Sequence, residues 1–225
     1  GRVMEGAGED PYLGSKIAFA RVQGFQGADL SKHTTLAACA KHFAAYGEVV
    51  AGREYNNVDI SRRKLWETHL PPFKAALDAG IKTFMNAFNE FEGVPASANT
   101  YLIDDILRGQ WAFDGVLVSD WDSIGAMVTS GVIEDDAGTA EMALEAGTDI
   151  DMESDVFVKY LPELPVCEGV KLAANVAEFA ALVAEVAAFV SAVSALVSAV
   201  SAFVSAVSAF VSAVSAFDSA VSASV

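Results

Sequence analysis

The chain has 225 residues, and its 30 acidic side chains against 14 basic ones give a net charge of −16 at pH 7. This excess of negative charge argues against nucleic acid or anionic lipid as a partner, because both are polyanions. Two cysteines, Cys39 and Cys167, provide no disulfide framework. The sequence contains no phosphate-binding loop and no metal-ligand cluster, so we predict no cofactor and no metal. An uncharged ligand such as a sugar suits this composition.

Four short runs with strand character, each leading into polar residues, are spread over the first two thirds of the chain. They are Leu36–Ala40, Ile81–Met85, Val116–Val118 and Thr148–Asp151. The run Val116–Val118 contains no polar residue and lacks helical spacing, which predicts a strand buried on both faces, as in a parallel sheet. Asp120 then falls at the carboxyl end of that strand, and Lys41 and His42 follow the first run in the same way.

Segments with helical character separate these runs. They are Ser61–Ala79, Asn99–Trp111 and Ala137–Ala146. The first has a capping residue in Asp59 or Ser61, and the last ends at Gly147. Strand and helix alternating at this spacing predict βα units and a parallel sheet. In a barrel of such units the active site lies at the carboxyl ends of the strands, which makes Asp120 a candidate catalytic residue.

Several short motifs, each weak alone, occupy the same region. In chain order they are Gly1-Arg2 with Glu5, Gly8-Glu9-Asp10-Pro11-Tyr12-Leu13, Lys41-His42-Phe43, Leu70-Pro71-Pro72-Phe73, Phe88-Asn89-Glu90 with Gly93-Val94-Pro95, Ile106-Leu107-Arg108, and Val118-Ser119-Asp120-Trp121. As an ordered set they resemble the catalytic barrel domain of glycoside hydrolase family 3, the β-glucosidase and exo-glucanase type. The resemblance covers residues 1–164.

The resemblance implies an α/β fold, a partial (β/α)8 TIM-type barrel that consists of about the last four βα units. Arg2 already belongs to a motif that stands midway through the family's barrel, so we expect the earlier strands to be missing. The aspartate that usually binds the sugar's distal hydroxyls would be missing with them. A half-barrel would expose two sheet edges, which need covering by another segment or another chain.

The resemblance also implies that Asp120 is the nucleophile of a retaining β-glycosidase, forming a glycosyl-enzyme that water later hydrolyses. Ala44-Ala45-Tyr46-Gly47 stands where family members acting on N-acetylglucosaminides carry a Pro-Gly-His-Gly stretch that supplies their general acid/base. The chain therefore resembles the glucosidase branch. There the acid/base is generally a glutamate outside the barrel, and we expect no counterpart of it in this chain.

The same comparison implies a set of substrate-binding side chains. They are Arg2, Lys41 and His42 as ligands of sugar hydroxyls, Trp121 as an apolar face for the pyranose ring, and Met85 and Phe88 as walls of the pocket. Phe88 takes a position where many relatives carry tyrosine. We interpret His33 and His69 as surface residues, and Trp66 and Trp111 as residues that pack helices against the sheet.

After residue 164 the composition changes almost entirely to Ala, Val, Ser and Phe. A seven-residue repeat runs from Val190 to Phe217 and predicts one broad apolar helical stripe over the second domain, residues 165–225. This tail could pack on the half-barrel or pair between chains. It could instead be a membrane segment, since residues 186–217 carry no charge, although Lys/Arg flanks are missing. A degenerate or artificial extension is the third interpretation.

Two functions therefore follow from the sequence. The first is hydrolysis of terminal non-reducing β-D-glucosyl or related residues from a β-glucoside or oligosaccharide, impaired if half the barrel is absent. The second is a catalytically inactive half-barrel whose tail mediates self-association or membrane contact. The sequence shows no signal peptide, so the periplasmic or secreted location common among relatives is inferred from the resemblance alone.

Overall fold

The computed structural model describes residues 5–163. Arg2 and the repeat that begins at Val190 lie outside the described residues. The domain boundary at residue 164, the helical tail and its self-association or membrane contact therefore stay predictions.

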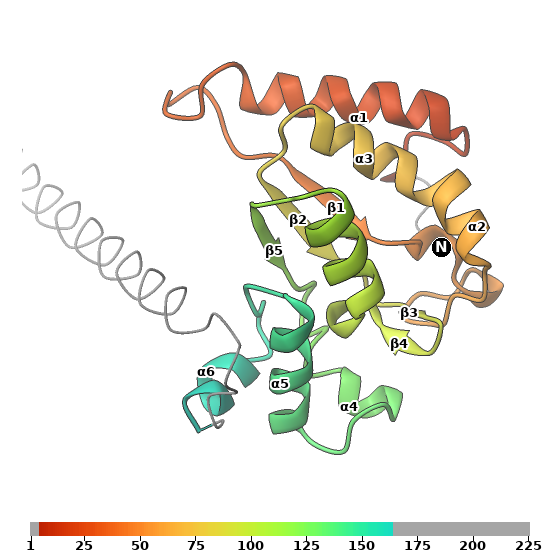
Figure 1. The fold of residues 1–225 in the computed structure, drawn as a ribbon, viewed down its shortest axis with the longest axis vertical. Helices are drawn as coiled ribbons and strands as arrows, with labels where there is room; N and C mark the ends of the chain where they lie inside the picture. Colours follow the sequence, from red (N-terminus) through yellow and green to blue (C-terminus); the bar gives the residue numbers. More distant parts are fainter. Residues whose placement is uncertain (1–4, 164–225) are drawn as a thin grey trace, which may run out of the picture. The chain divides into compact units, whose positions relative to one another are not determined.

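A three-stranded parallel sheet in the order β1-β2-β5 forms the centre of the described region. Its strands are β1 (Cys39–Phe43), β2 (Thr83–Asn86) and β5 (Val116–Val118), and a separate antiparallel hairpin consists of β3 (Glu90–Phe91) and β4 (Val94–Pro95). Figure 1 shows α1 (Pro11–Gln26) and α3 (Leu70–Asp78) running side by side along the sheet. The parallel sheet with flanking helices, predicted from the alternation of elements, is confirmed.

The remaining helical elements lie between and after the strands. They are η2 (Tyr46–Glu48), η3 (Val50–Gly52), α2 (Arg62–Lys64), η4 (Leu65–His69), η5 (Ala96–Ala98), η6 (Tyr101–Gln110), α4 (Met127–Ser130), α5 (Asp136–Ala146), α6 (Val156–Tyr160) and η7 (Leu161–Glu163). Among residues 5–163, no helix combines the length and the apolar character needed to cross a membrane.

The predicted helices are found close to their predicted bounds. Elements α2, η4 and α3 follow one another directly over residues 62–78, and the Ser61 hydroxyl caps the first turn by accepting a hydrogen bond from the Lys64 N–H at 3.2 Å. The Asp135 carboxylate does the same for α5 through the Gly138 N–H at 2.8 Å. This helix ends at Gly147, whose φ of 100° suits glycine far better than other residues.

The strands deviate from the sequence prediction in position and extent. Lys41 and His42 belong to β1 itself, because parallel pairing with β2 begins at Cys39 opposite Thr83, and Leu36 precedes it. In β2 the pairing likewise starts two residues later than the predicted Ile81.

The predicted burial of β5 on both faces is also wrong, because Val116 is 39% exposed. On the side of β5 away from β2, the ladder pairing amounts to one parallel bridge, Val118 with Ile150. The predicted fourth strand Thr148–Asp151 is reduced to this bridge. The parallel orientation of this bridge agrees with the predicted parallel sheet.

Helix α1 was not predicted, although the sequence carries its signals. The Asp10 carboxylate accepts a hydrogen bond from the Tyr12 N–H at 2.8 Å, and Pro11 stands at the first helical position. At the other end, the buried Gln26 donates to the Gly80 carbonyl at 2.8 Å and accepts from the N–H groups of Ala38 and Lys82 at 3.2 Å each. Gln26 thus ties α1 to the starts of β1 and β2.

Aromatic rings fill the space between the sheet and the helices. Trp111 packs edge-on against Phe43 of β1 at 6.0 Å between ring centroids, and Trp66 packs against Trp111 at 6.3 Å. The packing roles predicted for both tryptophans are confirmed. His69, however, is not a surface residue. Its side chain is only 15% exposed, and its Nε2 lies 3.6 Å from a carboxylate oxygen of Glu48.

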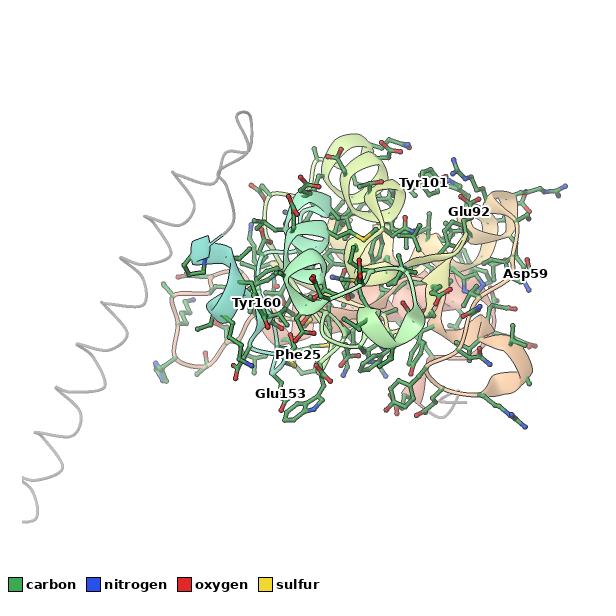
Figure 2. The ribbon with its side chains drawn as sticks, turned by 90° about the horizontal axis from the view of Figure 1, so that it is seen from below. Phe25, Asp59, Glu92, Tyr101, Glu153 and Tyr160 are labelled. Carbon is green, nitrogen blue, oxygen red and sulfur yellow. The ribbon has the colours of Figure 1, made fainter. Side chains whose placement is uncertain are left out.

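Arg62 joins the first helical stretch to the β3–β4 hairpin. It forms a two-pronged ion pair with Glu92, with Nη2 2.6 Å from Oε2, and its guanidinium lies 3.8 Å from the centre of the Tyr101 ring. The Tyr101 hydroxyl in turn accepts a hydrogen bond from Trp66 Nε1 at 2.9 Å. Figure 2 shows Glu92 and Tyr101 close to each other, as these contacts require.

Candidate active site

Asp120 follows β5 at the carboxyl end of the parallel sheet and is 8% exposed. Its neighbour Ser119 is fixed to the adjacent segment, because its N–H donates to the Ile150 carbonyl at 2.8 Å and its hydroxyl accepts from the Met152 N–H at 2.8 Å. The backbone that carries Asp120 is therefore tied to residues 150–152.

Among residues 5–163, two groups approach the Asp120 carboxylate, one at each oxygen. The Trp121 N–H donates to Oδ1 at 2.8 Å, and His42 Nε2 lies 3.2 Å from Oδ2. The His42 side chain is 9% exposed, so the pair is largely shielded from solvent. Because β1 and β5 are parallel and both flank β2, their carboxyl ends meet at one edge of the sheet, which is what brings these two predicted site residues together.

A chain of buried hydrogen bonds supports the loop that follows Asp120. The Asn86 side chain donates to the Thr148 hydroxyl at 2.8 Å, and that hydroxyl donates to the Ser97 carbonyl at 2.8 Å. The hydroxyls of Ser97 and Ser123 are 2.8 Å apart. Thus the end of β2, the Thr148 segment, η5 and the Asp120 loop are joined below the site.

Asp120 opens into a cleft with a volume of about 850 Å³. Its lining residues are Tyr55, Asn57, Phe88, Glu90, Pro95, Asp120, Trp121, Asp122, Ser123, Ala126, Met127, Thr129 and Ser130. Figure 1 shows the β3–β4 hairpin and α4, which both supply lining residues, at the same end of the sheet. A carboxylate at the base of an open, mostly polar cleft suits a neutral, hydroxyl-rich ligand.

The predicted substrate-binding residues are distributed unevenly around this cleft. Phe88 and Trp121 line it, and Trp121 is 62% exposed, so its ring is accessible to a ligand. Lys41 is exposed, and Met85 pairs with Val118 inside the sheet; neither lines the cleft. Arg2 lies outside the described residues.

Several lining residues were not found from the sequence. Tyr55 and Asn57 come from the loop before α2, and Thr129 and Ser130 from α4. These residues stand in segments without periodicity, so neither spacing nor hydrophobic pattern marks them. The position of Asp122, two residues after Asp120, was the one available signal.

The cleft is rich in negative charge, with the carboxylates of Glu90, Asp120 and Asp122 among its lining. Burial raises the pKa of Asp122, and the nearby carboxylates of Asp151 and Asp136 raise it further. Within residues 5–163, no group of three His, Cys, Asp or Glu side chains could hold a metal ion.

Comparison with known proteins identifies the family of the chain. The family model described as 'Glycosyl hydrolase family 3 N terminal domain' matches residues 1–186. The chain belongs to glycoside hydrolase family 3. The N-terminal domain of this family is a TIM-barrel-like α/β fold, with which the parallel sheet and helices agree, and the family inferred from the motifs is confirmed.

Relatives of this family 3 chain include a periplasmic beta-glucosidase of Salmonella typhimurium, 41% identical over 164 residues, which cover 73% of this chain and 21% of the relative. A beta-xylosidase of Formosa agariphila is 41% identical over 156 residues, covering 68% and 22%. The β-glucosidase from Listeria innocua, solved in complex with gluconolactone, superposes with a TM-score of 0.72 at 44% identity, over 75% of this chain and 24% of that one. The chain spans about a fifth of the length of the curated relatives it matches.

Proposed function

We propose that the chain contributes the catalytic nucleophile of a retaining β-glycosidase that removes terminal non-reducing β-D-glucosyl or related residues, and that this nucleophile is Asp120. The observation that carries the proposal is the shielded carboxylate at the base of the cleft, held at one oxygen by the Trp121 N–H and faced at the other by His42. A carboxylate fixed in this way is oriented for attack before substrate arrives.

The proposed reaction has two displacements. In the first, an Asp120 oxygen bonds to the anomeric carbon, the glycosidic bond breaks, and the leaving oxygen takes a proton from a general acid. In the second, water attacks the same carbon, loses its proton to the conjugate base, and releases the sugar and the free carboxylate. We assign the acid/base to no residue of this chain, in line with the expectation that it lies outside the barrel.

The remaining side chains would bind the sugar that is attacked. His42 lies next to the nucleophile, with Nε2 3.2 Å from Asp120 Oδ2, and would contact a hydroxyl of the sugar that is attacked. Trp121 offers an exposed ring, and Phe88 also lines the cleft. Arg2, Lys41 and Met85 keep their proposed roles as substrate ligands or pocket residues on the resemblance alone.

The substrate class rests on the named relatives. The Listeria innocua β-glucosidase has been solved with glucose, and a mutant of it with laminaribiose. Other relatives are called beta-xylosidases, so a β-glucoside or a β-xyloside fits the family. We propose a β-linked glucoside or oligosaccharide as substrate, and a periplasmic or secreted location by analogy with the Salmonella relative.

We also propose that β1, β2, β5 and the segment around Ile150 are four successive βα units of the barrel. Supporting this is the strict parallel order of the pairings and the position of Asp120 at their common carboxyl edge. These four units would contact a bound sugar from one side of the barrel.

The test is the intact mass of the 225-residue chain after incubation with an activated 2-deoxy-2-fluoro-β-D-glucoside, which needs the nucleophile but little acid assistance. We expect a gain of one fluoro-sugar in the parent and in Asp122→Asn, which alters another carboxylate of the cleft, and none in Asp120→Asn. Labelling of Asp120→Asn would overturn the assignment. Folded parent protein that is never labelled, and that associates as its concentration rises, would favour the inactive, self-associating alternative suggested by the repeat.

A further inference from the structure

The turn that carries the proposed nucleophile is closed by hydrogen bonds to the Asp120 carbonyl. This carbonyl accepts from the Ser119 hydroxyl and from the Ser123 N–H, each at 3.0 Å. Within the turn, Asp122 has a φ of 53°, in the left-handed region that residues with a side chain seldom adopt. Such a conformation persists where the surrounding contacts hold it in place. The position of Asp120 therefore depends on what holds residues 120–123.

Residues 120–123 have two anchors. One is a backbone bond, in which the Asp122 N–H donates to the Met152 carbonyl at 2.9 Å. The other joins two buried hydroxyls, those of Ser123 and Ser97, which lie 2.8 Å apart. Because the second anchor consists of side chains, a substitution can remove it and leave the backbone bond in place.

Ser97 is in turn fixed to the sheet. It belongs to η5, which follows the β3–β4 hairpin, and its carbonyl accepts a hydrogen bond from the Thr148 hydroxyl at 2.8 Å. The same hydroxyl accepts one from the side chain of Asn86, at the carboxyl end of β2, also at 2.8 Å. Thr148 and Asn86 are both buried, and shielding from water strengthens polar contacts of this kind. A continuous buried path thus runs from β2 to the turn of the nucleophile.

We propose that Ser97 is a positioning residue for the reaction: acting through Ser123, it holds the Asp120 turn in the orientation that attack on the anomeric carbon requires. This inference rests on the proposed function. Ser97 does not line the cleft and is 1% exposed, so it does not contact a bound sugar itself. Its hydroxyl accordingly affects how fast the nucleophile reacts and not how tightly the sugar binds.

The experiment follows labelling of the whole 225-residue chain by the activated 2-deoxy-2-fluoro-β-D-glucoside at a series of reagent concentrations. The series separates the rate constant of labelling from the apparent affinity for the reagent. Ser97→Ala should lower the rate constant by about fivefold to tenfold and leave the affinity unchanged, because a nucleophile that loses its orientation reacts more slowly while the sugar contacts remain.

A second variant and their combination test the route through the hydroxyl pair. Ser123→Ala removes the other half of the pair and should lower the rate constant by a similar factor. The double variant should be no slower than the slower single variant, because both substitutions remove the same interaction.

Thr139→Val is the matched control. Thr139 is fully buried, and its hydroxyl donates to the Asp136 carbonyl at 2.7 Å, a bond that stays within α5. The variant therefore loses a buried hydroxyl bond that does not hold the Asp120 turn, and it should keep the parent's rate constant. Urea unfolding of each variant shows whether the control and Ser97→Ala lose similar stability.

Folded Ser97→Ala that is labelled at the parent's rate would overturn the positioning role, and so would an equally slow Thr139→Val. Losses that multiply in the double variant would also overturn it, because the two hydroxyls would then act separately. If Ser97→Ala does not fold, labelling of Ser123→Ala at the parent's rate has the same meaning. A parent that is never labelled removes the proposed function and the positioning role together, whereas a labelled parent with an unaffected Ser97→Ala removes the positioning role alone.

Discussion

His42 Nε2 and Asp120 Oδ2 lie 3.2 Å apart, across a sheet in which β2 separates their strands. The Trp121 N–H donates to the other carboxylate oxygen, Oδ1, and the His42 side chain faces Oδ2. Both partners are largely shielded from water, which strengthens a polar contact between them. The contact links the first and the last strand of the sheet at the proposed reacting atom.

His42→Ala should therefore slow formation of the fluoro-glycosyl enzyme by about 10-fold to 100-fold, because a reacting group that loses its fixed orientation reacts more slowly by such factors. His42→Gln, which keeps an N–H donor, should lie between the parent and His42→Ala. The time course of labelling by intact mass measures this, with the exposed His33→Ala as control. An unchanged rate in folded His42→Ala would contradict a positioning role.

Two glycines should respond in opposite directions to the same substitution. A methyl group on Gly115 would collide with the Lys82 carbonyl and lie 2.6 Å from the Phe113 ring, directly before β5. We expect Gly115→Ala to lower the free energy of unfolding by about 3 kcal/mol, the upper range for overpacking. Gly24 lies inside α1 with nothing within 4 Å of the added methyl. Gly24→Ala should raise the free energy of unfolding by about 0.5–1 kcal/mol.

Urea unfolding followed by circular dichroism measures both changes on the same chain. If Gly115→Ala is as stable as the parent, then Gly115 does not lie as close to the Lys82 carbonyl and the Phe113 ring as the structure indicates.

Local sequence patterns were sufficient to predict β5, the helices on either side of it and the position of Asp120. They could also place His42 near Asp120, because parallel strands that end in polar residues present them at a common edge. Helix α1 was not predicted although Asp10 and Pro11 mark its start, because few of its side chains are buried and its sequence has no clear apolar stripe.

Other features depend on contacts between distant segments and have no local signal. Tyr55 reaches the cleft through a loop whose course depends on packing against Phe88. The exposure of Val116 depends on how many residues pair with β5, and the burial of His69 on the approach of Glu48. Periodicity describes which face of an element is apolar, but not which neighbour covers it.

Removing the Gln26 side chain should destabilise the chain far more than removing that of Gln23 in the same helix. Gln26→Ala leaves the Ala38 and Lys82 N–H groups and the Gly80 carbonyl without the side chain that now bonds them. We expect a loss of about 3 kcal/mol, because unsatisfied buried groups cost about 1–3 kcal/mol each and some will recover water. Gln23 is exposed and makes one such bond, to the Ala79 carbonyl, so Gln23→Ala should cost less than about 1 kcal/mol.

Urea unfolding of the two variants side by side is the measurement. Equal losses in both would mean that Gln26 does not hold α1 to the starts of the strands.

The pH dependence of stability should report the burial of His69. Burial lowers the pKa of His69 below its ordinary value of 6.5; Glu48, 3.6 Å away, opposes this, and Lys64 adds to it. The folded chain therefore keeps His69 neutral at a pH where the unfolded chain already binds a proton. Stability from this group is fully present above pH 6.5 and is lost as the pH falls from 6.5 towards the lowered pKa of the folded state.

His69→Gln cannot bind that proton, so its free energy of unfolding should fall less than the parent's between pH 7 and about pH 5. The two curves should diverge only below pH 6.5, with the parent showing the steeper loss. Urea unfolding at a series of pH values provides both curves, and the exposed His33→Gln serves as the control for removing a histidine. Parallel curves for the parent and His69→Gln would mean that His69 titrates alike in the folded and unfolded chain, and a shallower loss in the parent would place its folded pKa above 6.5.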